Sequence, residues 1–181
     1  LSVLAWRVSF GPCASLSMTN EVPTHVITSL SVALVVLAKA PVPGLAKTRL
    51  ALTVGSEAAA ALAYRLLSHT LATVRDSGLS ATLCGAPHGH PLLVELAEQA
   101  GVELTAQSEG DLGQRLEAAM SQALCTHDAV LVIGSDCPGL TVQHLHQAAR
   151  ELARHDAVFY PALDGGYTLI GLRKISEGLF K

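Results

Sequence analysis

Three cationic side chains follow the most apolar stretch of the chain. That stretch, residues 32–38, has the sequence VALVVLA and predicts a strand that is buried on both faces. The loop after it is stiffened by prolines and turned by a glycine; its candidate phosphate-binding residues are Lys39, Pro43, Gly44, Lys47 and Arg49. Cations beside the end of a buried strand favour an anionic ligand, most simply a phosphorylated one.

This loop resembles the end of a P-loop, whose glycines let backbone N–H groups surround phosphate. Pro41 and Ala46 stand where that motif requires its two glycines, and a proline has no N–H to offer. We therefore expect side chains, with Lys47 foremost, to bind the phosphates.

Asp136 follows a second apolar strand, residues 129–133, and lies between Gly134 and Pro138. A carboxylate at the exit of a buried strand is a suitable hard ligand for Mg²⁺ or Mn²⁺. Such a metal ion would neutralise charge on a leaving diphosphate. We expect Lys47 and Asp136 to act in catalysis.

Two further polar segments follow predicted strands, and they supply the candidate substrate-positioning residues Glu109, Asp111, Arg115, Asp164 and Gly165. Simpler interpretations stay open for both segments. Asp111 and Arg115 are four residues apart and can pair within one helix turn, and Asp111 is also a plausible helix N-cap. Asp164 and Gly165 have the composition of a hairpin turn.

The pattern between these segments predicts an α/β fold. Strands are expected at 32–38, 79–84, 102–106, 129–133, 157–161 and 167–171, with helices at 56–76, 91–100, 112–124 and 141–154. Strands that alternate with helices indicate a three-layer α/β/α sandwich around a mostly parallel sheet. The last connection is too short for a crossover, so the C-terminal strand should be antiparallel. The first helix should bury a leucine-rich stripe made of Leu62, Leu66, Leu67, Leu71 and Val74.

In such a sheet the loops after parallel strands meet at one edge, where ligands bind. The polar segments 39–49, 107–115, 134–139 and 162–166 all follow strands. We therefore expect them to form one site.

Composition narrows the class of protein. The chain has 181 residues, a net charge of −3 and 15% charged residues, which fits one globular domain and disfavours nucleic acid as a partner. No apolar run approaches the roughly 20 residues of a membrane span. The four cysteines form no CxxC pair, which predicts reduced thiols and a cytoplasmic protein. Residues 1–30 differ in pattern, so we expect a disordered extension before a single domain at 31–181.

Four motifs together resemble a bacterial family of glycosyltransferases of unassigned substrate: AKAPVPGLAKTRL, QSEGDLGQR, IGSDCP and DGGYTLIGL. That family is similar to nucleotide-diphospho-sugar transferases of the GT-A fold and related to the guanylyltransferases of molybdenum-cofactor and phospholactate-derived cofactor synthesis. The resemblance implies that loop 39–49 binds nucleotide phosphates and that Asp136 binds the metal. The usual Asp-x-Asp motif is here Gly-Ser-Asp136, so Asp164, or residues beyond Lys181 where the family pattern continues, would supply the second ligand.

These observations predict a metal-dependent transferase that uses an activated nucleotide, with Mg²⁺ or Mn²⁺ as cofactor. We expect first a glycosyltransferase that takes a nucleotide-diphospho-sugar and a small acceptor of unknown identity. The alternatives are a nucleotidyltransferase that uses an NTP and a nucleotide-binding module without turnover.

Overall fold

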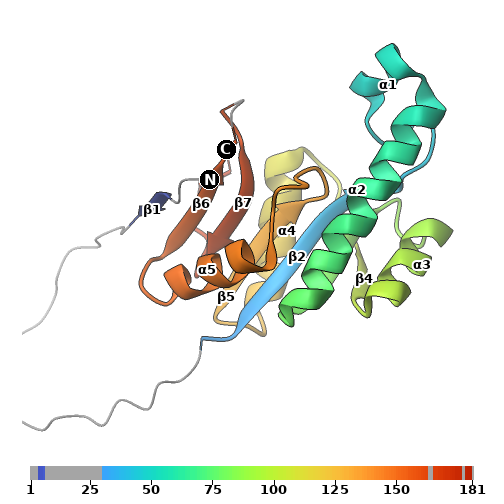
Figure 1. Ribbon diagram of the computed structural model, residues 1–181. Coiled ribbons are helices and arrows are strands. Elements are labelled where there is room, and N and C mark those ends of the chain that lie inside the picture. Colours follow the sequence, from blue (N-terminus) through green and yellow to red (C-terminus); the bar gives the residue numbers. More distant parts are fainter. Residues whose placement is uncertain (1–3, 7–29, 163–164, 177, 181) are drawn as a thin grey trace, which may run out of the picture.

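The computed structural model describes residues 4–6, 30–162, 165–176 and 178–180. Its elements are β1 (Leu4–Trp6), β2 (Val32–Lys39), α1 (Thr48–Val54), α2 (Ser56–Ser77), β3 (Ser80–Ala86), α3 (Pro91–Ala100), β4 (Glu103–Ala106), α4 (Leu112–Leu124), β5 (Ala129–Gly134), α5 (Val142–Leu152), β6 (Ala157–Pro161) and β7 (Tyr167–Leu172). Figure 1 shows how they are arranged.

The strands form one sheet in the order β1-β6-β7-β5-β2-β3-β4. Strand β2 is parallel to both neighbours, β3 and β5, and β4 continues the parallel set beyond β3. Strand β7 lies antiparallel between β5 and β6. The mostly parallel sheet with an antiparallel C-terminal strand is therefore confirmed.

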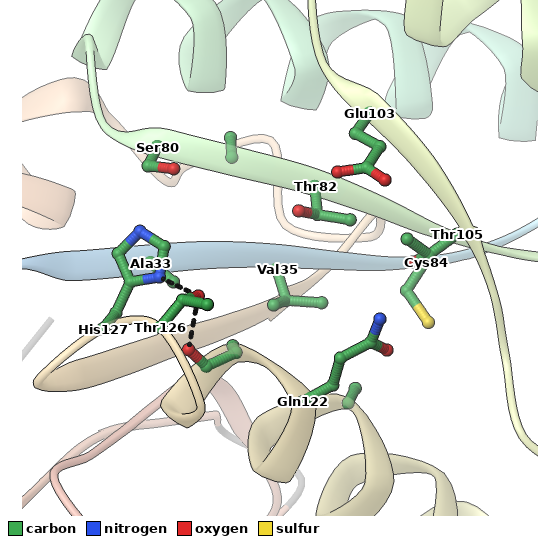
Figure 2. A pocket seen from close by; sticks show the side chains of 13 residues that line it. Ala33, Val35, Ser80, Thr82, Cys84, Glu103, Thr105, Gln122, Thr126 and His127 are labelled. Atoms are coloured by element: carbon green, nitrogen blue, oxygen red, sulfur yellow. Dashed lines mark hydrogen bonds between the residues drawn. The ribbon is translucent and has the colours of Figure 1, made fainter.

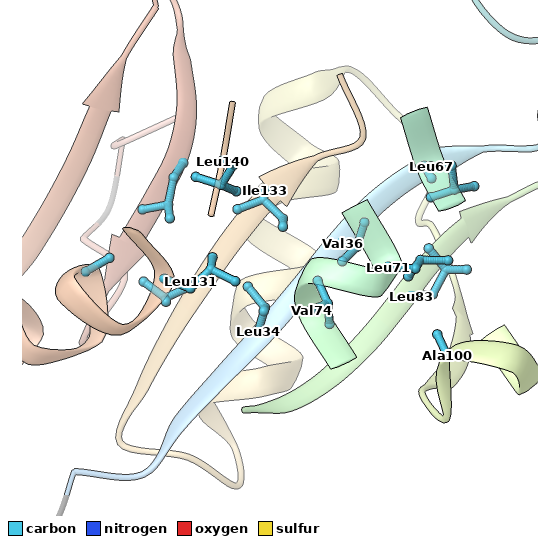
Figure 3. Packing of buried hydrophobic residues seen from close by; sticks show 14 of the residues in the cluster. Leu34, Val36, Leu67, Leu71, Val74, Leu83, Ala100, Leu131, Ile133 and Leu140 are labelled. Carbon is cyan, nitrogen blue, oxygen red and sulfur yellow. The ribbon is translucent and has the colours of Figure 1, made fainter. Parts of the chain in front are cut away.

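Helices cover both faces of the sheet, which gives three layers. Leu34 and Val36 of β2 face one way, toward the larger core that α2, α3 and α5 complete (Figure 3). Ala33 and Val35 face the other way and pack in a second cluster with Leu116, Ala119 and Met120 of α4. Strand β2 is buried on both faces because its apolar side chains alternate between these two cores.

Two elements were not predicted from the sequence. Strand β1 belongs to the N-terminal extension for which disorder was expected, and it pairs antiparallel with β6. Apart from residues 4–6 and 30, that extension lies outside the described residues. Helix α1 follows the cationic loop and stands at the end of α2, away from the sheet (Figure 1). Within the described chain, no helix has both the length and the apolar character needed to cross a membrane.

Candidate active site

The carboxyl ends of β2 and β5 lie side by side, because the two strands are parallel and Leu37 is paired with Gly134. The loops that leave them meet the start of α4 around a pocket of about 340 Å³. Its lining residues are Leu37, Ala38, Lys39, Ala46, Lys47, Ala63, Gln107, Leu112, Arg115, Gly134, Ser135 and Asp136. The structure thus brings Lys39, Lys47, Arg115 and Asp136 together at one edge of the sheet.

Lys47 has an uncommon backbone conformation. Its φ of 48° and ψ of 43° are left-handed, and it is the one non-glycine residue of the described chain with a positive φ. Such a conformation is strained for a residue with a β-carbon, and strain of this kind is concentrated at functional sites. The turn before it, in which Ala46 N–H donates to the Val42 carbonyl at 3.3 Å, leads the chain into this conformation.

From this backbone conformation the Lys47 side chain reaches Asp136, and its Nζ lies 2.8 Å from Oδ1. The lysine side chain is 17% exposed, whereas the aspartate is 70% exposed. The pair therefore places a mostly enclosed positive charge beside an open carboxylate. A phosphate that enters the pocket would meet the same ammonium.

Asp136 suits a metal ion only if other donors complete the coordination. No three His, Cys, Asp or Glu side chains gather into a metal site in the described part of the chain, and Asp164, the expected second ligand, lies outside the described residues. Mg²⁺ commonly takes one or two carboxylates and obtains its remaining ligands from phosphates and water. The open carboxylate of Asp136 fits that mode of binding.

Gln107 is a lining residue that the sequence did not single out. Its side-chain amide donates to the Ala38 carbonyl at 2.8 Å and to the Cys84 carbonyl at 2.9 Å. These carbonyls belong to the ends of β2 and β3, so one side chain ties two strand ends beside the pocket. Both amide hydrogens are used, which leaves Oε1 as the polar atom that Gln107 can offer to a ligand.

The start of α4 orients Arg115. Asp111 caps the helix by accepting from the Gln114 N–H at 2.9 Å, and the Gln114 side-chain Oε1 accepts from the Asp111 N–H at 2.9 Å. Arg115 then donates from Nε to the Gly110 carbonyl at 2.9 Å instead of pairing with Asp111. This bond holds the guanidinium at the pocket, while the Asp111 carboxylate is occupied as a cap.

The other predicted residues lie outside this pocket. Arg49 lines an adjoining pocket with Lys39, Lys47 and Asp136. Glu109 is exposed, and it belongs to none of the pockets around Asp136. Pro43, Gly44 and Gly165 are exposed loop positions, and the two glycines have the positive φ that such turns require, 82° and 87°.

A third pocket, of about 310 Å³, lies on the other side of Asp136, between the end of β5 and the β6–β7 connection. Cys137, Tyr167 and Thr168 are among its lining residues. Asp136 therefore lines three pockets at the same edge of the sheet, a position suited to a group that acts between two substrates.

A separate pocket of about 270 Å³ lies on the α4 side of the sheet, toward the starts of the strands (Figure 2). Thr82, Glu103 and Thr105 project into it from β3 and β4 (Figure 2). It contains none of the predicted site residues, and its polar side chains suit a sheet face that meets water.

Comparisons with known proteins agree with this architecture. A structure from Desulfovibrio desulfuricans G20, described as a candidate nucleotide-diphospho-sugar transferase, is 30% identical over 84% of this chain and 68% of its own, with a TM-score of 0.76. A 4-diphosphocytidyl-2C-methyl-D-erythritol synthase from Anaerococcus prevotii DSM 20548 is 10% identical, with a TM-score of 0.55 over 80% of this chain and 72% of its own. A cytidylyltransferase from Leptospira borgpetersenii serovar Hardjo-bovis (strain JB197) is 13% identical, with a TM-score of 0.50 over 80% and 60%.

The last two similarities, at such low identity, concern the fold alone. No protein with curated annotation matches the sequence. Residues 70–181 match the model of a family described as "Uncharacterized protein conserved in bacteria (DUF2064)". The matched segment spans more than half of the chain, and the protein therefore belongs to the DUF2064 family.

Proposed function

We propose that this protein is a transferase that uses an activated nucleotide, and that it transfers a glycosyl group from a nucleotide-diphospho-sugar. One observation carries the proposal: Lys39, Lys47 and Arg115 line the same pocket as the open carboxylate of Asp136, at the carboxyl ends of parallel strands. Ligands of open α/β sheets bind at this edge. The volume of about 340 Å³ lies in the range of small-molecule sites.

The Desulfovibrio relative supports the choice of donor, because it shares 30% of the sequence and is described as a candidate nucleotide-diphospho-sugar transferase. In our proposal Lys39 and Lys47 bind the diphosphate, and Arg115 binds it from the side of α4. The leaving nucleoside diphosphate gains negative charge as the bond to the sugar breaks. Cations already in place stabilise that charge without reorganisation.

Lys47 and Asp136 have linked tasks in this mechanism. Asp136 neutralises and orients the Lys47 ammonium before the substrate arrives. When a phosphate enters, Lys47 can share its three donor hydrogens between the carboxylate and a phosphate oxygen. Mg²⁺ or Mn²⁺ held by Asp136 and the substrate would supply further charge neutralisation.

Nucleotidyl transfer from an NTP is the second candidate, because the same residues could bind the triphosphate. The fold shared with two cytidylyl-transferring enzymes favours this alternative, as does the resemblance to guanylyltransferases. The two reactions differ in the atom attacked: the sugar C1 in glycosyl transfer and the α-phosphorus in nucleotidyl transfer. A cation-lined pocket serves both.

Thermal-shift measurements with nucleotide-diphospho-sugars and with NTPs, each with and without Mn²⁺, test the proposal. A nucleotide sugar should raise the Tm of the wild type, and Lys47→Gln and Asp136→Asn should reduce the shift. Arg75→Gln is the matched control, because Arg75 is an exposed cation at the far end of α2. If no nucleotide shifts the wild type, the proposed function is wrong.

Product analysis then separates the two reactions. Incubation with an acceptor mixture should release a nucleoside diphosphate in glycosyl transfer and pyrophosphate in nucleotidyl transfer. Binding without either product would identify a nucleotide-binding module. Loss of the Mn²⁺ effect in Asp136→Asn would support the metal assignment, and an unchanged effect would remove it.

A further inference from the structure

Helix α1 and the start of α2 expose more apolar surface than their sequence predicts. None of the seven residues of α1 is buried, and Leu52 is 90% exposed. Leu62 belongs to the predicted buried stripe of α2 but is 41% exposed. Five of the eight large exposed hydrophobic residues of the described chain fall between positions 45 and 64: Leu45, Leu52, Val54, Leu62 and Tyr64. Leu62 and Tyr64 are two residues apart on α2 and so lie on different sides of that helix, whereas Leu45 and Leu62 line the same pocket.

Leu45 and Leu62 expose their apolar side chains at the pocket that contains Arg49. The pocket measures about 380 Å³ and is lined by Lys39, Leu45, Lys47, Thr48, Arg49, Leu50, Leu62 and Asp136. Its lining thus combines three cations with three leucines. The one carboxylate is already paired with Lys47, and neither Lys39 nor Arg49 forms a salt bridge with a described residue.

The combination specifies a ligand with two parts. Unpaired cations attract an anion, and Arg49 can bind a phosphate with two parallel hydrogen bonds. The leucines would remain in water if the ligand were inorganic phosphate alone. An alkyl chain attached to the phosphate would cover them, and each buried methylene would strengthen binding. Aromatic residues on which a nucleobase could stack are missing from this lining.

We propose that this pocket binds an amphiphilic phosphate, with its head group on Arg49 and its chain along Leu45, Leu50 and Leu62. Lys47 and Asp136 line both this pocket and the proposed nucleotide pocket, so the head group would lie next to the nucleotide phosphates. The ligand would then be the second substrate, an assignment that rests on the proposed function. Binding of the amphiphile itself does not depend on that function.

Isothermal titration with alkyl phosphates below their critical micelle concentrations tests the proposal. Decyl phosphate should bind more tightly than octyl phosphate by roughly tenfold, because two more methylenes are buried. Both should bind more tightly than inorganic phosphate, and decanol should bind weakly because it lacks the anion. Equal affinity for decyl phosphate and inorganic phosphate would overturn the proposal.

Two variants localise the site. Leu62→Ser should abolish the preference for the longer chain, and Arg49→Gln should weaken every alkyl phosphate by about tenfold or more. Both positions are exposed, so the fold should tolerate the changes. Arg115→Gln is the matched control: it should weaken nucleotides and leave decyl phosphate unchanged. If Leu62→Ser still bound decyl phosphate more tightly than octyl phosphate by the wild-type factor, the proposal would be overturned.

Two further experiments test whether a different partner covers Leu45, Leu50 and Leu62. Binding to phosphatidylcholine vesicles that contain phosphatidate, without binding of free decyl phosphate, would assign the leucines to a membrane surface and overturn the proposal. A dimer in sedimentation velocity that Leu62→Ser dissociates would assign them to a second copy, with the same consequence. If decyl phosphate binds while no nucleotide does, the pocket assignment holds and the proposed function fails.

Discussion

At the scale of single residues, Lys47 shows how the chain accepts strain in order to place a charge. The left-handed backbone directs the side chain to Asp136, where Nζ lies 2.8 Å from Oδ1. Mutation of Lys47 can separate the backbone strain from the ion pair. Glycine and alanine both remove the ion pair with Asp136, but only glycine also relieves the strain.

Lys47→Gly should therefore be more stable than Lys47→Ala, by about 1 kcal/mol in the free energy of unfolding. Both variants lose the ammonium, so both should lose most of the nucleotide-induced Tm shift. Urea denaturation measures the difference in stability. The same two substitutions at Arg75, inside α2, should give the opposite order, because glycine weakens a helix by about 1 kcal/mol relative to alanine. Equal stability of the two Lys47 variants would show that the backbone is not strained.

The described cysteines differ in burial, so they should differ in reactivity. Burial raises the pKa of the Cys84 thiol, which also donates to the Ala106 carbonyl at 3.4 Å. Cys125 is exposed at the end of α4. Because the thiolate is the reactive form, iodoacetamide at pH 8 should label Cys125 well before Cys84 in the native protein. Peptide mapping by mass spectrometry at several times measures both rates, and the difference should vanish in 8 M urea. Equal native rates would contradict the burial of Cys84.

At the scale of elements, Gln107 connects segments that the sequence keeps far apart. Its two acceptors lie 69 and 23 residues away along the chain. Loss of the side chain leaves the carbonyls of Ala38 and Cys84 without this donor at the ends of two strands. A partly buried group that loses its hydrogen bond costs about 1–3 kcal/mol.

Gln107→Ala should accordingly lower the free energy of unfolding by about 2 kcal/mol. Gln107→Glu should destabilise the protein more at neutral pH, because a carboxylate has no hydrogen to donate and would face two carbonyl oxygens. Chemical denaturation monitored by circular dichroism measures both. Gln99→Ala is the control, since Gln99 bonds only to Glu95 on the surface of α3 and its loss should cost less than about 0.5 kcal/mol. An unchanged free energy of unfolding in Gln107→Ala would argue against a stabilising role for the hydrogen bonds from Gln107 to Ala38 and Cys84.

The elements also show which features the sequence could predict. The apolar runs of β2 and β5 have few alternatives to buried parallel strands, so their exits, with Lys39 and Asp136, could be assigned to one edge. Gln107 could not be recognised, because its role depends on carbonyls that only the folded sheet brings near. Helix α1 was missed because it has no side-chain cap and is separated from α2 only by Gly55, with a φ of 86°.

Long-range partners explain the remaining differences. Strand β1 has three residues, too few for a pattern, and exists through its pairing with β6. Leu112 begins the amphipathic helix α4, yet it is 68% exposed at the rim of the pocket that contains Asp136, whereas Leu116 one turn later is buried. Periodicity identifies the apolar face of a helix, but it does not show where the covering layer ends.

At the scale of the whole molecule, the two central strands are joined at the edge opposite the site. Ser31, just before β2, donates from its backbone N–H and its hydroxyl to Asp128 Oδ2, at 2.9 and 2.8 Å. Asp128, just before β5, returns a bond from its own N–H to the Ser31 hydroxyl at 3.0 Å. The bond from the Ser31 backbone N–H, followed by the bond from its hydroxyl, holds the pKa of Asp128 below its ordinary value of 3.8. The folded protein thus favours the ionised carboxylate.

A lowered pKa in the folded state means that this carboxylate stabilises the fold at pH values above 3.8. The contribution should decrease as the pH falls below 3.8 and end once the pH has passed the lower folded pKa. Asp128→Asn, which cannot ionise, should therefore have a lower Tm than the wild type at pH 7, and the gap should narrow toward pH 3. Thermal unfolding of both proteins across this range measures the gap. Asp76→Asn, in an exposed pair with Arg75, should change the Tm little, because such pairs contribute little to stability. A gap that stays constant down to pH 3 would show that the charge of Asp128 does not stabilise the junction of β2 and β5.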